Sequence, residues 1–177
     1  MNNINKILSK IVFTVAVIAG LSVRTNAQVT NLILNGNMEG AAAAWTQTST
    51  NFGTPVCTAA ACGLGGGTGP HAGAGWCWFG GLGGALEQAS IVQTVTIPTG
   101  LVSANLNFWL EVPVCDSVGG LQDYMALLID ADTLYFVTGN DVLCGTIGYG
   151  QQTFNVLPYA DGNPHTITFI STTFGTG

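Results

Sequence analysis

Basic residues are almost absent from this sequence. Its 177 residues include three lysine or arginine residues, Lys6, Lys10 and Arg24, against nine aspartates and glutamates, and the formal net charge is −6 at pH 7. A chain that carries no cationic side chain beyond residue 24 cannot neutralise phosphate groups. Nucleic acids and anionic lipid surfaces are therefore poor partners, and we expect no nucleic acid to bind.

The three basic residues lie in a segment that we expect to be removed. Two lysines precede an apolar run, residues 11–23, and Thr25-Asn26-Ala27 supplies the small residues that a signal peptidase reads. The run is short for a bilayer span, and a retained anchor is the alternative reading. We predict a signal peptide over residues 1–27 and a secreted or cell-surface protein in which residues 28–177 form a single domain.

The scarcity of lysine and arginine also limits how the acidic residues can be stabilised. Without salt bridges, a buried carboxylate must accept hydrogen bonds from backbone N–H groups, be protonated, or bind a metal cation. Calcium is a candidate because it prefers oxygen ligands. The alternative is that most of the acids are exposed and only keep the chain soluble.

Disulfides are expected because five cysteines occur in an exported chain. Cys57 and Cys62 can close a short local ring. The segments 124–129 and 134–138 predict a hairpin, so the chain enters and leaves it at the same end, where Cys115 and Cys144 can pair. Such a bridge contributes about 2–4 kcal/mol. Cys77 is then a buried thiol, and metal binding by cysteine is not expected because the sequence has no C-x-x-C pair.

The rest of the sequence favours strands and has no credible long helix. Aromatic and β-branched residues recur at period two between glycine and proline turns, most clearly over residues 69–100. This pattern predicts an all-β sandwich of about eight short antiparallel strands with 69–100 at its centre. The predicted strands cover residues 31–35, 45–50, 76–79, 87–97, 104–112, 124–129, 134–138, 151–157 and 165–172. Because the sequence stops in turn-like residues, we expect one module of a longer protein, or a fragment that lacks its closing strand.

Several of these segments carry motifs known from one domain family. Together they resemble galactose-binding-like jelly-roll domains, a group that includes many carbohydrate-binding modules of secreted bacterial (Bacteroidetes-like) proteins. The resemblance covers most of residues 31–177 and implies a jelly-roll β-sandwich. The matching segments are Asn35-Gly36-Asn37-Met38-Glu39-Gly40 with Trp45, the Gly/Pro/His turn and Trp-x-Gly segment at 69–81, Gln93-Thr94-Val95-Thr96-Ile97-Pro98, Leu106-Asn107-Phe108-Trp109-Leu110, and His165-Thr166-Ile167-Thr168-Phe169.

The resemblance implies a structural calcium ion near the first motif. In such domains the glutamate after the first strand helps to bind calcium, together with backbone carbonyls and an acid of the closing strand. Glu39 stands at that position, and Asn37 is near enough to contribute. The acid of the closing strand has no counterpart in this sequence.

Aromatic residues are the candidate ligand-binding positions, because sugar rings stack on aromatic faces. Trp76 and Trp78 share one face of a predicted strand that is apolar on both sides, so core packing is the favoured role for them. Trp45, Tyr149 and Tyr159 lie nearer to loops and are the predicted ligand-binding residues.

The sequence does not indicate an enzyme. His71 and His165 are the only histidines, and neither a G-x-S-x-G nor an H-E-x-x-H motif accompanies them. Asp130 and Asp132 are explained by the turn of the predicted hairpin.

We therefore expect a non-catalytic binding or adhesion module whose partners are polysaccharides or glycans and other modules of the same secreted protein. The alternatives are a self-associating structural protein of a surface or matrix, and an accessory domain of a secreted hydrolase.

Overall fold

The computed structural model describes residues 31–80, 85–115, 117–118 and 121–174. The predicted signal peptide, residues 1–27, lies outside these residues. Within them, no helix has both the length and the apolar character that crossing a membrane requires.

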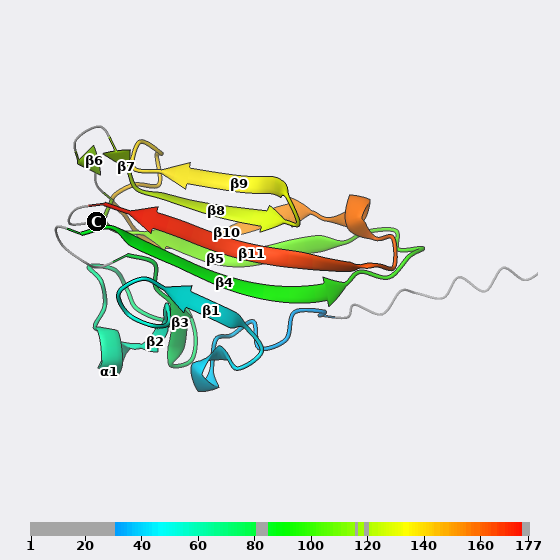
Figure 1. Ribbon diagram of the computed structural model, residues 1–177, viewed down its shortest axis with the longest axis horizontal. Coiled ribbons are helices and arrows are strands. Elements are labelled where there is room, and N and C mark those ends of the chain that lie inside the picture. The colour runs from blue at the N-terminus through cyan, green and yellow to red at the C-terminus, as the bar shows by residue number, and fades with distance from the viewer. Residues whose placement is uncertain (1–30, 81–84, 116, 119–120, 175–177) are drawn as a thin grey trace, which may run out of the picture.

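One layer of the fold is a five-stranded antiparallel sheet with the order β1-β4-β11-β8-β9 (Figure 1). The long strands β4 and β11 pair over ten residues in its centre, and β8 and β9 form the predicted hairpin at one edge. The strands are β1 (Thr46–Ser49), β4 (Glu87–Thr96), β8 (Tyr124–Ile129), β9 (Asp132–Thr138) and β11 (Pro164–Thr173).

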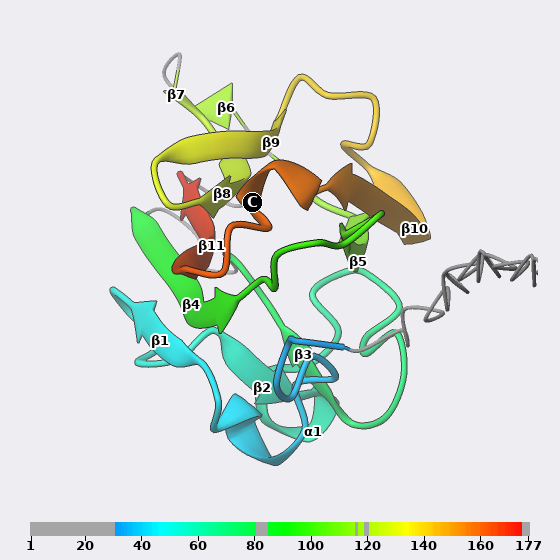
Figure 2. The same ribbon diagram turned by 90° about the vertical axis from the view of Figure 1, so that its right-hand side faces the viewer.

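The second layer is an antiparallel pair, β5 (Asn105–Val112) and β10 (Thr146–Asn155). It lies against one face of the five-stranded sheet, as the side view shows (Figure 2). The predicted all-β sandwich is confirmed. Smaller elements complete the described chain: η1 (Gly40–Ala42), β2 (Val56–Thr58), α1 (Ala59–Cys62), β3 (Gly75–Cys77), β6 (Ser117–Val118), β7 (Leu121–Gln122) and η2 (Leu157–Tyr159).

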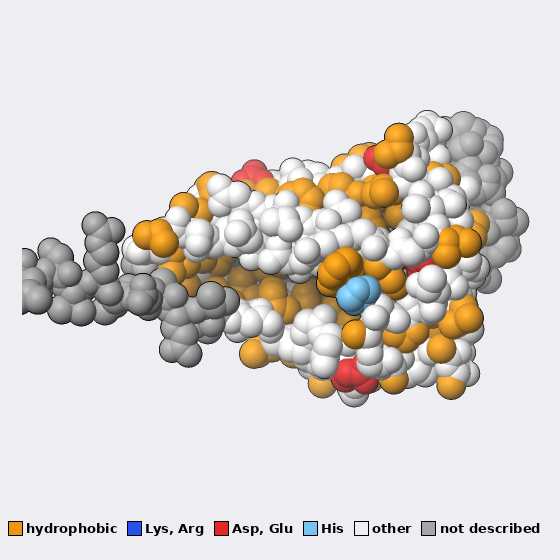
Figure 3. All heavy atoms as spheres, turned by 180° about the vertical axis from the view of Figure 1, so that it is seen from behind, with side chains coloured by type: hydrophobic (Ala, Val, Ile, Leu, Met, Phe, Trp, Pro, Cys, Tyr) orange, Lys and Arg blue, Asp and Glu red, His pale blue; other side chains and the backbone are white. Residues whose placement is uncertain are grey.

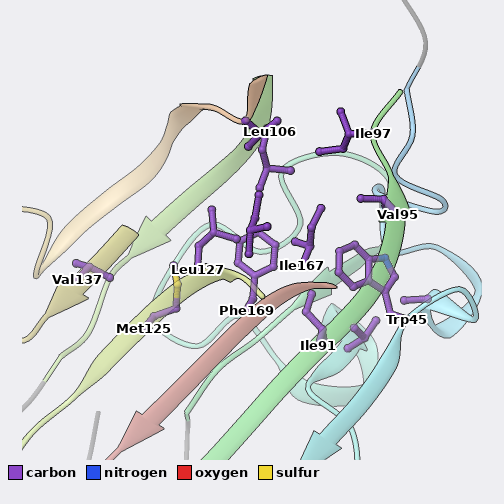
Figure 4. Packing of buried hydrophobic residues seen from close by; sticks show 14 residues of the cluster. Trp45, Ile91, Val95, Ile97, Leu106, Met125, Leu127, Val137, Ile167 and Phe169 are labelled. Atoms are coloured by element: carbon purple, nitrogen blue, oxygen red, sulfur yellow. The ribbon is translucent and has the colours of Figure 1, made fainter. Parts of the chain in front are cut away.

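The core forms because side chains alternate between the two faces of each strand. In β11 the inward residues Ile167 and Phe169 are 3% and 8% exposed. The Phe169 ring meets Phe108 of β5 at a centroid distance of 5.0 Å, so it joins the two layers. Its centroid also lies 6.3 Å from that of Trp45 (Figure 4). Ile91 and Leu127, from the neighbouring strands, are at most 2% exposed.

One predicted strand is wrong, and another lies in a different place than expected. Residues 31–35 are not a strand, because the chain turns at residues 34–37, where Asn35 has a φ of 50°. The buried side chain of Gln93 holds this turn, since its Oε1 accepts from Leu34 N at 2.8 Å and its Nε2 donates to Leu34 O at 2.9 Å. A side-chain amide thus replaces the strand partner that the pattern at 31–35 predicts.

The segment 76–79 is not a central strand either. Its strand β3 pairs only with β2, a three-residue strand in the region predicted as a loop. The second half of the 69–100 segment forms β4, an interior strand of the five-stranded sheet between β1 and β11.

Both predicted disulfides are present. Cys57 and Cys62 join β2 to the end of α1, with their Cα atoms 6.3 Å apart. Cys115 and Cys144 connect the segments that precede and follow the β8–β9 hairpin, with a Cα distance of 5.8 Å. Cys77 is the free cysteine. Burial raises the pKa of its thiol, which keeps it protonated and unreactive.

At the opposite end of the sandwich, His165 lies between two carboxylates. Its Nδ1 is 2.7 Å from Asp130 Oδ2 and its Nε2 is 3.0 Å from Asp161 Oδ1. Hydrogen bonds to Asp130 and then Asp161 raise the pKa of His165. The pKa of Asp161 falls to about 2, mainly through hydrogen bonds from Asn163 and then from His165. Asp130, predicted to serve the turn, also accepts from Thr166 N at 2.8 Å.

This arrangement predicts how stability depends on pH. Because the pKa of His165 is higher in the folded state than its ordinary value of about 6.5, the stabilisation is complete below pH ~6.5 and is lost as the pH rises through the folded-state pKa. We expect the Tm, measured by circular dichroism between pH 5 and 9, to decline over this window. His165→Gln should remove the decline and His71→Gln should retain it. An unchanged decline in His165→Gln would contradict the assignment.

Candidate functional site

The outer face of the β5–β10 pair carries uncharged polar side chains around an exposed tryptophan. In β5, Phe108 faces the core while Asn107 and Trp109 face outward, and Trp109 is 46% exposed. The antiparallel register places Gln151 beside Trp109 and Thr153 beside Asn107. We call this surface the amide face; it consists of Asn105, Asn107, Trp109, Gln151, Thr153 and Asn155, all of them exposed.

The chemistry of the amide face suits a ligand rich in hydroxyl groups. An Asn or Gln side chain offers both donors and an acceptor, and a threonine hydroxyl can do either. The indole ring of Trp109 offers an apolar surface beside them. A surface of this kind can align a neutral polar molecule by hydrogen bonds on one side and a flat apolar contact on the other.

Trp109 belongs to a small aromatic cluster. His71 stacks on the Trp109 ring, with the centroids 4.2 Å apart and an interplanar angle of 15°. The Tyr149 ring meets His71 edge-on at 5.1 Å, and its hydroxyl donates to Gly69 O at 2.7 Å. The cluster thus extends the amide face towards the loop that precedes β3.

Glu111, two residues beyond Trp109 on the same face of β5, fixes that loop. Its carboxylate accepts from Thr68 N at 3.0 Å, from Thr68 Oγ1 at 3.0 Å and from Gly148 N at 2.6 Å. Partial burial acts to raise the pKa of Glu111, but the hydrogen bonds from Thr68 and Gly148 outweigh it and the pKa is lowered. The carboxylate is ionised at neutral pH and holds two segments of backbone beside the aromatic cluster.

The structure separates the three predicted ligand-binding residues. Tyr149 lies in the aromatic cluster. Tyr159 lies at the other end of β10, where its hydroxyl donates to Asp132 Oδ2 at 2.9 Å. Trp45 is 6% exposed, and its Nε1 donates to Asn35 O at 3.2 Å. The prediction for Trp45 needs correction, because a ring buried against Phe169 has no face to offer a ligand.

Sequence reasoning missed Trp109 and His71. The alternation in residues 104–112 contains the signal for Trp109, since this residue falls on the polar side of the strand, in phase with Asn107. A large aromatic residue on the solvent side of an alternating strand indicates a contact surface. No sequence signal indicates that His71 stacks on Trp109, because the two residues are brought together only by the Glu111 hydrogen bonds and the fold.

Glu39, the predicted calcium ligand, accepts hydrogen bonds from the backbone where β3 begins. Its Oε1 accepts from Ala74 N at 2.7 Å and from Gly75 N at 3.0 Å, and these bonds lower its pKa, Gly75 contributing most. The close approach needs glycine: a Cβ at Gly73 would collide with Glu39 Oε1, and a Cβ at Gly75 with Met38 O.

These contacts fit a calcium ion poorly. Calcium takes six to eight oxygen ligands, whereas Glu39 Oε1 faces two N–H donors, whose positive ends repel a cation. Within the described residues, no group of three or more His, Cys, Asp and Glu side chains could hold a metal ion. Asn37 is exposed beside Glu39. Calcium at Glu39 and Asn37 stays a prediction from the resemblance.

The side of the molecule that carries β5 and β10 is hollowed (Figure 3). Hydrophobic side chains line the floor of a long depression, a histidine stands beside it, and acidic groups are sparse on this side. The visible, described surface shows no lysine or arginine.

Comparison with known proteins identifies a similar fold. A solved structure of the carbohydrate-binding module TmCBM61, in complex with β-1,4-galactotriose, matches 84% of this chain and 91% of its own, with a TM-score of 0.54 and 15% sequence identity. No protein-family model matches the sequence, and no curated protein matches it. At 15% identity, the likeness shows a shared β-sandwich fold and leaves the ligand of this chain open.

The Glu39 contacts predict how stability responds to mutation and to chelation. Glu39→Ala removes the acceptor for two backbone N–H groups and should lower the Tm by the same amount in excess calcium and in EDTA. Glu39→Gln keeps an acceptor oxygen and should lie between the wild type and Glu39→Ala. A fall in the wild-type Tm on chelation that is absent in Glu39→Ala would show that the glutamate holds calcium after all.

Proposed function

We propose that this protein is a non-catalytic carbohydrate-binding module that holds a neutral glycan on the amide face. The observation that carries the proposal is the exposed Trp109 ring within a row of uncharged hydrogen-bonding side chains on one rigid pair of strands. The β-sandwich fold shared with TmCBM61, which was solved with β-1,4-galactotriose, supports the same class of ligand.

A sugar ring can meet both parts of this surface at once. Its C–H groups pack against the aromatic ring, which excludes water from the apolar contact. Its hydroxyls, each a donor and an acceptor, reach the amides of Asn107 and Gln151 and the hydroxyl of Thr153. Because β5 and β10 are paired along their length, these groups are held in place before the ligand arrives, which reduces the entropy lost on binding.

The charge of the chain favours a neutral glycan over an acidic one. All nine acidic residues lie beyond residue 38, and the chain has no lysine or arginine beyond residue 24. A polysaccharide of uronic acids would meet a surface of the same sign without a cationic side chain to pair with its carboxylates. The ionised Glu111 at the end of the amide face adds to this repulsion.

The amide face also lacks the groups that glycoside hydrolysis needs. Two carboxyl groups on opposite sides of the scissile bond perform that reaction in most such enzymes. None of the described residues of the amide face and its aromatic cluster is acidic, and the oxygens of the adjoining Glu111 already accept from Thr68 and Gly148. The geometry supports retention of a sugar and not its cleavage.

The setting of this module is part of the proposal. Two disulfides and the expected signal peptide support an extracellular location. There the module would attach a longer secreted protein, built of further modules, to a polysaccharide or a cell surface. Within this proposal calcium has no role in ligand binding.

The central test is the replacement of Trp109. We expect the wild type to bind β-1,4-galactotriose or another neutral oligosaccharide from a panel of galactan, mannan, xylan and glucan fragments, measured by isothermal titration calorimetry. Trp109→Ala should weaken that binding at least tenfold, which corresponds to about 1.4 kcal/mol.

The matched control is Phe136→Ala, since Phe136 is 53% exposed on β9 of the other sheet. This variant should bind like the wild type. Failure of the wild type to bind any neutral sugar in the panel, or equal binding by Trp109→Ala, would overturn the proposal.

A second expectation concerns ligand charge. In affinity electrophoresis, a neutral galactan should retard the wild type, whereas polygalacturonate should not at low salt. Glu111→Gln should not create binding to polygalacturonate, because the remaining acids still repel it. Retardation by polygalacturonate at low salt would contradict the charge argument.

A further inference from the structure

A cavity of about 420 Å³ lies between the two sheets, at the end that carries the Cys115–Cys144 disulfide. Its walls come from the adjoining ends of β5, β8, β9 and β11, from residues 64–69, and from β3 with the following Trp78. None of the six residues of the amide face lines it, although Glu111 and Tyr149, which adjoin that face, do. Its volume is in the range of small-molecule sites.

The sequence of the five-stranded sheet explains why this end is not filled. Inward-facing residues form rows across the paired strands. In the filled part of the core Phe169 is paired with Ile91, whereas two residues further along Ser171 is paired with Ala89 on one side and Met125 on the other. Of these residues, Ser171 and Met125 line the cavity, and the small serine side chain fills less space than the phenylalanine two residues before it.

Two buried polar groups at this cavity have no partner. Ser171 Oγ and Trp76 Nε1 belong to residues that are 1% and 8% exposed, and neither atom has a hydrogen-bond partner among the described residues. An unsatisfied buried polar group costs about 1–3 kcal/mol and calls for a partner such as a ligand or a water molecule. Both residues line the cavity.

The remaining lining indicates the character of the partner. Trp76 and Trp78 meet edge to face, with their centroids 6.3 Å apart, and present aromatic surface to the cavity. The carboxylates of Glu111 and Asp123 also line it. An anionic ligand would therefore be repelled, whereas a flat neutral molecule with a polar substituent would fit.

We propose that this cavity is a second binding site, which takes a small neutral aromatic molecule bearing hydroxyl groups. Its rings lie against Trp76 and Trp78. A hydroxyl oxygen accepts from the Trp76 indole N–H, or a hydroxyl pairs with Ser171 Oγ, so that groups left without partners in the protein gain them from the ligand. This site does not depend on glycan binding at the amide face.

The test uses 2-naphthol and naphthalene as probes, because they differ only in the hydroxyl group. Binding is followed by quenching of tryptophan fluorescence in the full chain at pH 7, where 2-naphthol is neutral. We expect saturable binding, with 2-naphthol bound more tightly than naphthalene. In Ser171→Ala or Trp76→Phe, which remove a polar group and keep the cavity, the ratio of the two affinities should fall by about threefold or more.

Phe52→Ala serves as the control, since Phe52 is 53% exposed in a loop outside the cavity. It should retain both the affinities and their ratio, which excludes adsorption on surface aromatic residues. Absence of saturable binding by both probes would show that the cavity holds water only and would overturn the proposal. A ratio that stays unchanged in both Ser171→Ala and Trp76→Phe would also overturn it.

Discussion

The absence of cationic side chains is the constraint on which most of this structure depends. Because the described residues include no lysine or arginine, the carboxylates accept hydrogen bonds mainly from backbone N–H groups. Most of these bonds join segments that are far apart in the sequence, so the acidic residues act as connectors between loops. Backbone N–H groups donate to Glu39, Glu87, Glu111, Asp123, Asp130, Asp141 and Asp161.

The hydrogen bonds that Glu111 accepts account for how the aromatic cluster is held beside the amide face. Glu111 binds the loop around Thr68 and the start of β10 at the same time. That loop leads directly to His71, which can stack on Trp109 only because the loop is held at this edge. Hydrogen bonds from N–H groups to an ionised carboxylate are stronger than neutral ones. A lysine at these positions could not make the same connections, because its ammonium group only donates hydrogen bonds and cannot accept them from backbone N–H groups.

Sequence reasoning reached the features that depend on local pattern and on chain topology. The β8–β9 hairpin was predictable from alternation about Asp130, and the Cys115–Cys144 pairing followed from it. The need of the acids for N–H donors was predictable from composition. The predictions that failed concern contacts between distant segments. The Gln93 amide binds the backbone of Leu34, so residues 31–35 do not form a strand, and β3 pairs with β2. The exposure of Trp109 was predictable, because its position in the alternation of residues 104–112 places it on the solvent side of the strand.

The alternation of β5 explains how a thin sandwich can present two different chemistries. The outward set of this strand, with Asn107 and Trp109, faces solvent and suits a ligand rich in hydroxyls. The inward set, with Phe108 and Leu110, faces the core and ends at the cavity. Because successive residues of a strand point to opposite faces, a slip of one residue in the pairing with β10 would exchange the two sets. Phe108 resists that slip, since its ring contacts Phe169 of the opposite sheet. The same packing contact that joins the layers therefore also keeps Trp109 on the outside.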